Sequence, residues 1–458
     1  MASEQHNRIK EYEFTNTKED IIKKNYKFWR LCVFLSIYVI YFISYMSRKN
    51  FSAVMLDVQE ATNLKNAEIG LIISAFYIMY GLGKFINGTI ADRVSIKFWL
   101  PMSLIISSGL GALMPVCASY CNTKQSIFIT MILIWGLNGW FQSFAFPLCA
   151  KALTFWFCKK ERGRVWSWWG TSYELGEASV GFILLPFIET FGWQLGFYLP
   201  AIVSVFVALV TFFTLQDKPQ TIGLPEVEQY FGKTVEEAPE EDNTPYFKLL
   251  KKYIFGNKTM WILAFAFIFV NMLRCGSTDW VLKFFKEVGD TRTQATIKAA
   301  TVPISGVLGM LTIPIVSDKL FGGRRAPANF CYLGAAGIAL LCTIGILNHG
   351  PNTLTCAEKI GLFVCLAVLG AGTCGALTMM GGICSVESVS KKVAAAATGF
   401  TGMAGYIGAA SCSYITGYLK DAQWVKDYNI TFVEFWFWAF AAFIAAVLCL
   451  PLWNERSK

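Results

Sequence analysis

The sequence predicts an all-α integral membrane protein with twelve transmembrane helices in two pseudo-symmetric six-helix bundles. Three observations favour this fold class. Of the 458 residues, 55% are hydrophobic and only 16% are charged, whereas a soluble protein has about 25% charged residues. Twelve apolar stretches are long enough to cross a hydrocarbon core of about 30 Å. These stretches form two sets of six, separated by a polar interval at residues 216–258.

The first six apolar stretches begin near Leu31, Ile69, Phe98, Ile127, Val165 and Trp193, and the second six near Trp261, Thr296, Ala328, Ile360, Val393 and Phe432. We therefore expect an N-terminal segment at 1–28, a first bundle at 29–215, a linker at 216–258, a second bundle at 259–453 and a tail at 454–458. The linker is acidic, contains Pro and has no apolar run, so it should hold at most a short helix.

Basic residues concentrate in the loops on one side of the expected membrane. They are Arg93, Lys97, Lys159, Lys160, Arg162, Arg164, Lys319, Arg324, Arg325, Lys391 and Lys392. The bias places these loops and both termini in the cytoplasm. The net charge of +9 is then a topology signal, and no nucleic-acid partner is expected because nothing pairs the basic loops with a binding fold. We expect the polar N-terminus not to be a cleavable signal peptide.

Metal, redox and catalytic chemistry find little support in the sequence. The fourteen Cys are scattered singly, as expected for reduced core residues, and the only two His, His6 and His349, lie outside the expected spans. We expect no metal, no cofactor and no enzyme activity. The Gly-Lys-Thr at Gly232–Thr234 lacks the upstream Gly of a phosphate-binding loop, so ATP-driven transport is not supported. A secondary carrier remains.

The two halves share a repeat. One offset of 226 residues relates three pairs of charged residues at corresponding places: Asp92 and Asp318, Arg48 and Arg274, and Glu161 and Glu387. A shared offset favours a duplicated six-helix unit, the plan of many carriers.

Nine charged residues lie in or beside the apolar stretches: Arg48, Lys49, Lys84, Lys151, Glu174, Glu177, Arg274, Asp279 and Lys283. A cation at a helix centre costs about 2.5–3.5 kcal/mol and usually faces a cavity or a partner. We expect Lys49, Lys151 and Lys283 to snorkel to the membrane interface. Arg48 and Arg274 either hold the fold in an interhelical ion pair or converge on the axis between the bundles.

Two arginines on that axis would bind a phosphate, because the guanidinium fork makes paired hydrogen bonds to phosphate oxygens. Lys84 would add a third positive charge. Tyr41, Tyr45, Tyr80 and Trp140 could line the same cavity or simply pack in the core. An unloaded site with two or three unpaired cations should resist closure, which predicts obligate exchange.

Glu174 and Glu177 are three residues apart and so share a helix face. They could face inward and reduce the excess positive charge. Alternatively, they could meet Arg162, Arg164 or another helix near the cytoplasmic end.

Several segments carry a resemblance to a known family. GTIADRVSIK (Gly88–Lys97) resembles the loop motif of the major facilitator superfamily, with Ser95 where Gly is usual, and SDKLFGGRR (Ser317–Arg325) resembles its second copy. More specific segments resemble the organophosphate:phosphate antiporters, the bacterial hexose-phosphate and glycerol-3-phosphate transporters. These segments are SRKNF, YGLGKF, NGWFQS, KKERG, LRCGSTDW and GFTGMAGYIGA, and the likeness runs from the first helix to the twelfth.

The resemblance implies the major facilitator fold and roles for individual residues. Arg48 and Arg274 correspond to the family's phosphate-binding arginines, Lys84 to its helix-two lysine, and Tyr41 and Tyr45 to its helix-one tyrosines. The chain also departs from the family. Tyr173 stands where a helix-five His is usual, Pro303 replaces a helix-eight Glu, and the helix-ten segment AGTCGALTMMGG lacks the usual Gly-Pro. The resemblance thus implies that the phosphate-binding residues are retained, while the residues that recognise the organic group are altered.

We therefore expect a monomeric antiporter in a bacterial inner membrane that exchanges a sugar phosphate for inorganic phosphate by alternating access. Hexose 6-phosphate, such as glucose 6-phosphate, is the leading substrate. The expected binding residues are Arg48, Arg274, Lys84, Tyr41, Tyr45, Tyr80, Trp140 and Tyr173. The alternatives are a glycerol-3-phosphate:phosphate antiporter or a hexose-phosphate sensor that works with a histidine kinase. An enzyme acting on phosphate esters is disfavoured, because no nucleophile–base pair or metal cluster is visible.

Overall fold

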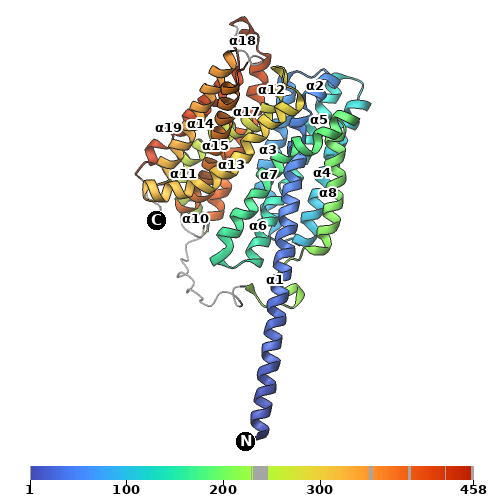
Figure 1. The fold of residues 1–458 in the computed structure, drawn as a ribbon, viewed down its shortest axis with the longest axis vertical. Helices are drawn as coiled ribbons and strands as arrows, with labels where there is room; N and C mark the ends of the chain where they lie inside the picture. Colours follow the sequence, from blue (N-terminus) through green and yellow to red (C-terminus); the bar gives the residue numbers. More distant parts are fainter. Residues whose placement is uncertain are drawn as a thin grey trace.

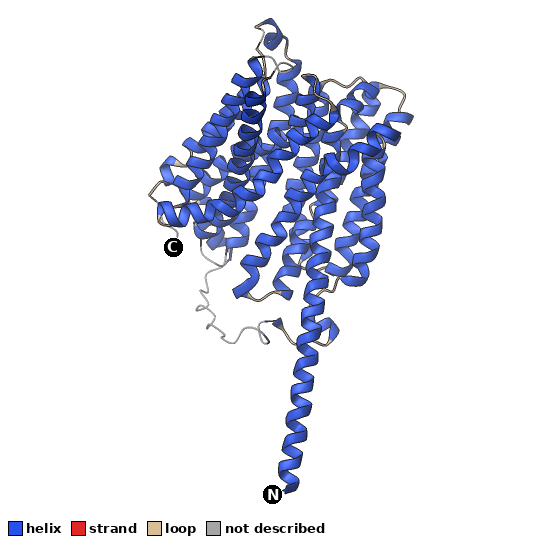
Figure 2. Ribbon diagram, viewed as in Figure 1, coloured by secondary structure: helices blue, strands red, loops and turns tan. Residues whose placement is uncertain are grey.

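The computed structural model describes residues 2–227, 230, 246–349, 354–389, 393–428 and 430–454. Gly232–Thr234, Lys391, Lys392 and most of the expected C-terminal tail lie outside these ranges, as do the side chains of Lys159 and Lys160. Within the described part all regular structure is helical (Figure 2).

The N-terminal half contains eight helices that make six spans. They are α1 (Ala2–Ala53), α2 (Met55–Thr62), α3 (Asn66–Ala91), α4 (Ile96–Tyr120), α5 (Lys124–Gln142), α6 (Ala145–Trp156), α7 (Lys159–Phe191) and α8 (Leu195–Thr214). The helices α5 and α6 form one span with a break at Ser143 and Phe144, and α2 is a short helix that follows the first span.

The C-terminal half repeats this plan after a 3₁₀ turn (Pro219–Ile222), α10 (Tyr246–Leu250) and a π-helical turn (Lys251–Phe255). The seventh span joins α11 (Lys258–Cys275), a π-helical turn (Gly276–Trp280) and α12 (Val281–Glu287). The others are α13 (Arg292–Phe321), α14 (Arg325–Asn348), α15 (Cys356–Thr378) with a π-helical turn (Met379–Cys384) and α16 (Ser385–Glu387), α17 (Ala394–Asp421), and α19 (Val433–Val447) with a 3₁₀ turn (Leu450–Leu452). The short α18 (Gln423–Asp427) lies before α19.

Ten helical segments in the described ranges are long and apolar enough to cross a membrane, and α7 and α17 complete the twelve. Of these two, α7 is more polar because it carries Glu174 and Glu177, and α17 is rich in small residues. The all-helical fold of twelve spans is therefore confirmed. The first helix differs from the expected start near Leu31, because α1 begins at Ala2. Its polar first part is rich in Glu and Lys, which favour helix without requiring lipid.

The described part of the linker contains only short helical pieces, and most of the acidic stretch 226–245 lies outside the described residues. Leu224 and Val227 pack against Tyr26 of α1, and the Tyr26 hydroxyl donates to the carbonyl oxygen of Pro225. The start of the linker thus packs against α1 of the first bundle.

The two bundles lie side by side, with α3 against α17 and α7 against α13 (Figure 1). Small residues permit close approach at this interface. A Cβ atom at Gly70 of α3 would overlap the backbone of Ser413 in α17, and one turn further Ser74 Oγ donates to the carbonyl oxygen of Ala410 at 2.6 Å. Side chains from both bundles therefore meet along the central axis.

Polar contacts join the bundles at the end remote from the N-terminus. They link Asp57 with Arg292 and Lys286, Lys283 with Gln59 and Asn66, and Asn66 and the Ala67 amide with Asp421. Figure 1 shows α2, α12 and α17 together at this end. The structure is thus a state of the protein that is closed at the end remote from the N-terminus.

Candidate anion-binding site between the bundles

Arg48 lies in the last part of α1 and is only 7% exposed. Its Nε donates to Gln142 Oε1 at 3.1 Å. Its guanidinium carbon lies 4.2 Å from the ring centre of Tyr80 and 4.3 Å from that of Tyr45, close enough for cation–π attraction. In the described part of the chain no carboxylate makes an ion pair with it. Arg48 is thus a buried cation surrounded by aromatic rings and one amide.

Arg274 lies in the last turn of α11 in the other bundle and is 8% exposed. Its Nη2 lies 3.0 Å from Glu177 Oε2 and 3.3 Å from Glu174 Oε1, both on α7. The two glutamates thus face inward and do not pair with Arg162 or Arg164, which settles the alternative that the sequence left open. The expectation of unpaired cations in the unloaded site is wrong for Arg274, because sequence periodicity does not reveal which helix faces it.

Aromatic rings connect the two arginines. The Tyr45 ring centre lies 5.2 Å from that of Tyr173, and the Arg274 guanidinium carbon lies 5.7 Å from the Tyr173 ring centre. Tyr41 packs on Trp169 at 4.5 Å between ring centres, and Tyr80 packs on a residue of the opposite bundle, Tyr406, at 4.7 Å. A set of neighbouring aromatic rings thus spans the axis from Arg48 to Arg274.

Lys49, next to Arg48 in the sequence, points to the opposite bundle. Its Nζ lies 2.5 Å from Asp279 Oδ1 and 2.8 Å from Thr278 Oγ1, and Tyr77 donates to Asp279 Oδ2 at 2.7 Å. Asp279 belongs to the π-helical turn of the seventh span, and such turns are frequent at functional sites. Lys49 is 3% exposed. The expectation that it snorkels to the interface is therefore wrong, because an acid in the other bundle provides a partner.

Lys283 likewise finds polar partners between the bundles, whereas Lys151 reaches the end of α3 and the loop that follows it. Lys283 is 1% exposed and donates to Gln59 and Asn66 at the closed end, so it does not snorkel. Lys151 Nζ donates to the carbonyl oxygens of Ala91, Asp92 and Val94. It thus caps the C-terminus of α3, where a cation is favourable.

Glu174 and Glu177 reach the axis because α7 packs very closely on α1. A Cβ atom at Gly176 would overlap the carbonyl oxygen of Phe42. Glu177 Oε1 then lies 3.3 Å from Lys49 Nζ, so this carboxylate contacts a cation from each bundle.

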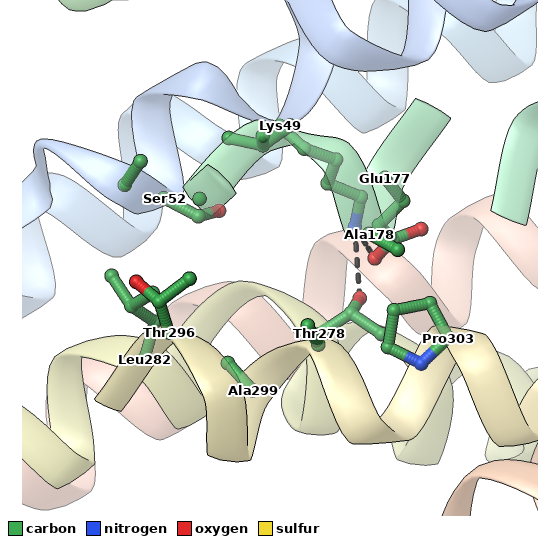
Figure 3. A pocket seen from close by; sticks show the side chains of 13 residues that line it. Lys49, Ser52, Glu177, Ala178, Thr278, Leu282, Thr296, Ala299 and Pro303 are labelled. Carbon is green, nitrogen blue, oxygen red and sulfur yellow. Dashed lines mark hydrogen bonds and ion pairs between the residues drawn. The ribbon is translucent and has the colours of Figure 1, made fainter. Parts of the chain in front are cut away.

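A small cavity of about 40 Å³ lies beside these charges. Figure 3 shows Lys49, Glu177, Thr278 and Pro303 on its walls. Binding pockets for small molecules have volumes of about 300–1,000 Å³, so this cavity has room for a few water molecules and not for a sugar phosphate.

Two other predicted residues lie differently from the arginines. Lys84 Nζ lies 4.5 Å from the ring centre of Phe146 and 5.6 Å from that of Tyr406, on the same side of the axis as Arg48. Trp140 is half-buried and is not among the rings around Arg48. Its carbonyl oxygen accepts from Asn87 Nδ2 at 2.9 Å, which joins α5 to α3.

Sequence reasoning missed four residues of this site: Phe76, Tyr77, Gln142 and Tyr406. Two of them lie in segments that carry the family resemblance, NGWFQS for Gln142 and GFTGMAGYIGA for Tyr406. Tyr77 and Tyr80 are three residues apart, so helical spacing from Tyr80 is the signal for Tyr77. Within the described ranges no cluster of His, Cys, Asp and Glu could hold a metal ion.

Comparison with known proteins agrees with this fold. The model of the Major Facilitator Superfamily matches residues 37–410. The chain belongs to the major facilitator superfamily. A solved structure of this fold, the D-xylose-proton symporter, is 14% identical and has a TM-score of 0.70, with 93% of this chain and 98% of that chain covered.

The relatives identify the branch of the superfamily. A probable hexose phosphate transport protein of Chlamydia pneumoniae is 32% identical, over 98% of this chain and 96% of the relative. The membrane sensor protein UhpC of Salmonella typhimurium is 29% identical, over 96% and 95%. The hexose-6-phosphate:phosphate antiporter of the same organism is 28% identical, over 82% and 79%. The chain is thus a multi-pass membrane protein of the organophosphate:phosphate antiporter family, and this family is one of transporters, not of enzymes.

Proposed function

We propose that this protein is a secondary-active antiporter that exchanges a sugar phosphate, with hexose 6-phosphate as the leading substrate, for inorganic phosphate by alternating access. The observation that carries the proposal is the position of Arg48 and Arg274. Arg48 lies in the first bundle and Arg274 in the second. Both are buried, and the rings of Tyr45 and Tyr173 lie between them. A phosphate held by both guanidinium groups would join the two bundles.

The chemistry of the site favours a phosphate over a neutral sugar. Arginine binds phosphate through paired, charge-assisted hydrogen bonds and stays charged at every physiological pH. Lys84 adds a positive charge on the Arg48 side of the axis. The tyrosines Tyr41, Tyr45, Tyr80 and Tyr173 offer hydroxyl groups and rings to the organic part of the substrate. Trp140 has a supporting place in this proposal, because its carbonyl oxygen joins α5 to α3 through Asn87.

The exchange mode and the hexose rest on the relatives. The probable hexose phosphate transport protein of Chlamydia pneumoniae covers nearly the whole chain, and the antiporter of Salmonella typhimurium is named for exchange with phosphate. The sensor relative supports a second candidate, a receptor that binds hexose phosphate without moving it.

Exchange in reconstituted vesicles tests this proposal. Vesicles loaded with unlabelled phosphate should take up labelled phosphate, and external glucose 6-phosphate should compete more strongly than glycerol 3-phosphate. Binding of glucose 6-phosphate without any exchange would favour the receptor. Stronger competition by glycerol 3-phosphate would favour the other antiporter.

We further propose a bacterial inner membrane as the location, with both termini and the linker in the cytoplasm and the closed end facing outward. A protease-cleavable tag inserted at residue 240 should resist external protease in intact cells and should be cut after lysis. Cleavage in intact cells would reverse the orientation inferred from the basic loops.

A further inference from the structure

The contacts of Arg274 with its two glutamates are longer than those of a strong ion pair. Charge-assisted hydrogen bonds between nitrogen and oxygen are typically about 2.7–2.9 Å long, whereas the Arg274 contacts measure 3.0 Å to Glu177 and 3.3 Å to Glu174. By contrast, Lys49 Nζ lies 2.5 Å from Asp279 Oδ1. Arg274 thus belongs to a loose cluster of charges, whereas Lys49 and Asp279 form a tight ion pair.

Several buried atoms of the loose cluster have no hydrogen-bond partner in the described part of the chain. They are Arg274 Nε, Glu174 Oε2 and Glu177 Oε1, the last of which has only the 3.3 Å ion pair with Lys49. A buried polar group without a hydrogen-bond partner destabilises the state that contains it. The unloaded site is therefore incompletely satisfied at the guanidinium that would bind phosphate.

Other polar groups are available to the Glu177 carboxylate when it leaves Arg274. Its carboxylate already contacts Lys49, and the water-sized cavity beside it is lined by the polar side chains of Ser52 and Thr278. Glu174 lies outside this cavity lining, beside Gly306 and the thiol of Cys374.

We infer that Glu174 and Glu177 are an internal counter-anion for Arg274, which the substrate phosphate displaces when it binds. The inference rests on the proposed function, because it requires a phosphate at Arg274. The glutamates belong to the first bundle and Arg274 to the second. Displacement therefore breaks a contact between the bundles and replaces it with phosphate bound to Arg48 and Arg274. The two carboxylates thereby set the affinity of the site.

Substitution of each carboxylate by its amide tests this inference. Glu174→Gln and Glu177→Gln keep the side-chain shape and remove the charge that competes with phosphate. If the internal anion leaves only about a tenth of the sites free, its loss tightens phosphate binding about tenfold. Inorganic phosphate is titrated against the full-length protein in nanodiscs, and the dissociation constant is measured by direct binding and by the phosphate-dependent rise in melting temperature.

Glu161→Gln is the matched control, because Glu161 lies on the same helix and pairs with Arg30 inside the first bundle. Its dissociation constant for phosphate should stay within about twofold of the wild type. Tighter binding in Glu174→Gln or Glu177→Gln, but not in the control, supports the inference. Unchanged or weaker binding in both overturns it.

Two further measurements separate the possible failures. Glu177→Asp retains the charge but draws it back from Arg274. It should tighten phosphate binding less than the amide variants do. It can replace an amide variant that does not fold. A wild-type protein that binds neither phosphate nor hexose phosphate would overturn the proposed function, and the inference with it. A wild type that binds phosphate, with variants that bind no tighter, would overturn the inference alone.

Discussion

Arg48 and Arg274 occupy equivalent positions in the two repeats, yet their surroundings differ completely. Arg48 lies among the rings of Tyr45, Phe76 and Tyr80 with one amide oxygen as a hydrogen-bond acceptor. Arg274 lies against two carboxylates that come from the opposite bundle. The duplication has preserved the cation and changed its partners.

This difference indicates that the two arginines have different roles at the proposed site. Aromatic faces attract a guanidinium without neutralising it, so Arg48 keeps its charge available to an anion. Carboxylates neutralise Arg274 until they are displaced. The electrostatic argument for obligate exchange thus applies to Arg48 and Lys84, and it does not apply to Arg274 in this state.

The largest effect is expected from replacing either arginine. In Arg48→Lys and in Arg274→Lys the charge remains but the guanidinium fork is lost. Loss of two charge-assisted hydrogen bonds, each about 1.5–3 kcal/mol, should reduce exchange by at least about 100-fold. Labelled phosphate exchange in vesicles measures this, with membrane insertion checked by immunoblotting. Near-normal exchange in either variant would show that charge alone suffices at that arginine.

A stability comparison tests the tight ion pair beside the arginines. Lys49→Met leaves Asp279 buried without its counter-charge, which should cost about 3–5 kcal/mol, and the double variant Lys49→Met, Asp279→Leu should recover most of that loss. Melting of the purified protein, followed by tryptophan fluorescence, reports the change. Lys124→Met is the control, because Lys124 pairs with Glu68 at the surface with 40% of its side chain exposed, and it should cost less than about 1 kcal/mol. A single variant as stable as the double would show that Asp279 needs no partner.

The sequence predicted the helices better than the contacts between them. Apolar length alone placed a span near Ile69, where α3 begins at Asn66, and one near Phe432, where α19 begins at Val433. The repeat offset selected Arg48 and Arg274 without any knowledge of their surroundings. Their roles as phosphate ligands remain a prediction.

The partners of the buried charges could not be predicted in the same way. Helical spacing showed that Glu174 and Glu177 share a face, but not which helix lies opposite, and Arg274 is 97 residues from Glu177 along the chain. Snorkelling of Lys49 and Lys283 to the membrane interface was the expectation. It was wrong because the neighbouring bundle supplies polar partners at that depth.

Lys84 sharpens the comparison between the two sides of the site, because it lies on the Arg48 side. It makes no ion pair among the described residues and packs near the rings of Phe146 and Tyr406. Lys84→Ala should weaken the apparent affinity for phosphate about tenfold, less than either arginine change, because a point charge near an anion is worth about 1–2 kcal/mol. Competition by unlabelled phosphate in the exchange assay measures this. A loss as large as that of Arg48→Lys would make Lys84 a direct ligand.

The smallest effect is expected from the aromatic faces that surround Arg48. Tyr80 lies 4.2 Å from the guanidinium and also packs on Tyr406 of the opposite bundle. Tyr80→Leu removes the ring, and with it a cation–π attraction of about 1 kcal/mol, so the apparent affinity for phosphate should fall about fivefold. Tyr80→Phe keeps the face of the ring and removes only the hydroxyl, so its affinity should stay within about twofold of the wild type. Titration of phosphate exchange for the two variants, beside the wild type, separates the ring from the hydroxyl. Equal losses in both variants would show that the hydroxyl contacts the substrate directly, and the contrast between an aromatic Arg48 site and an acidic Arg274 site would then rest on the carboxylates alone.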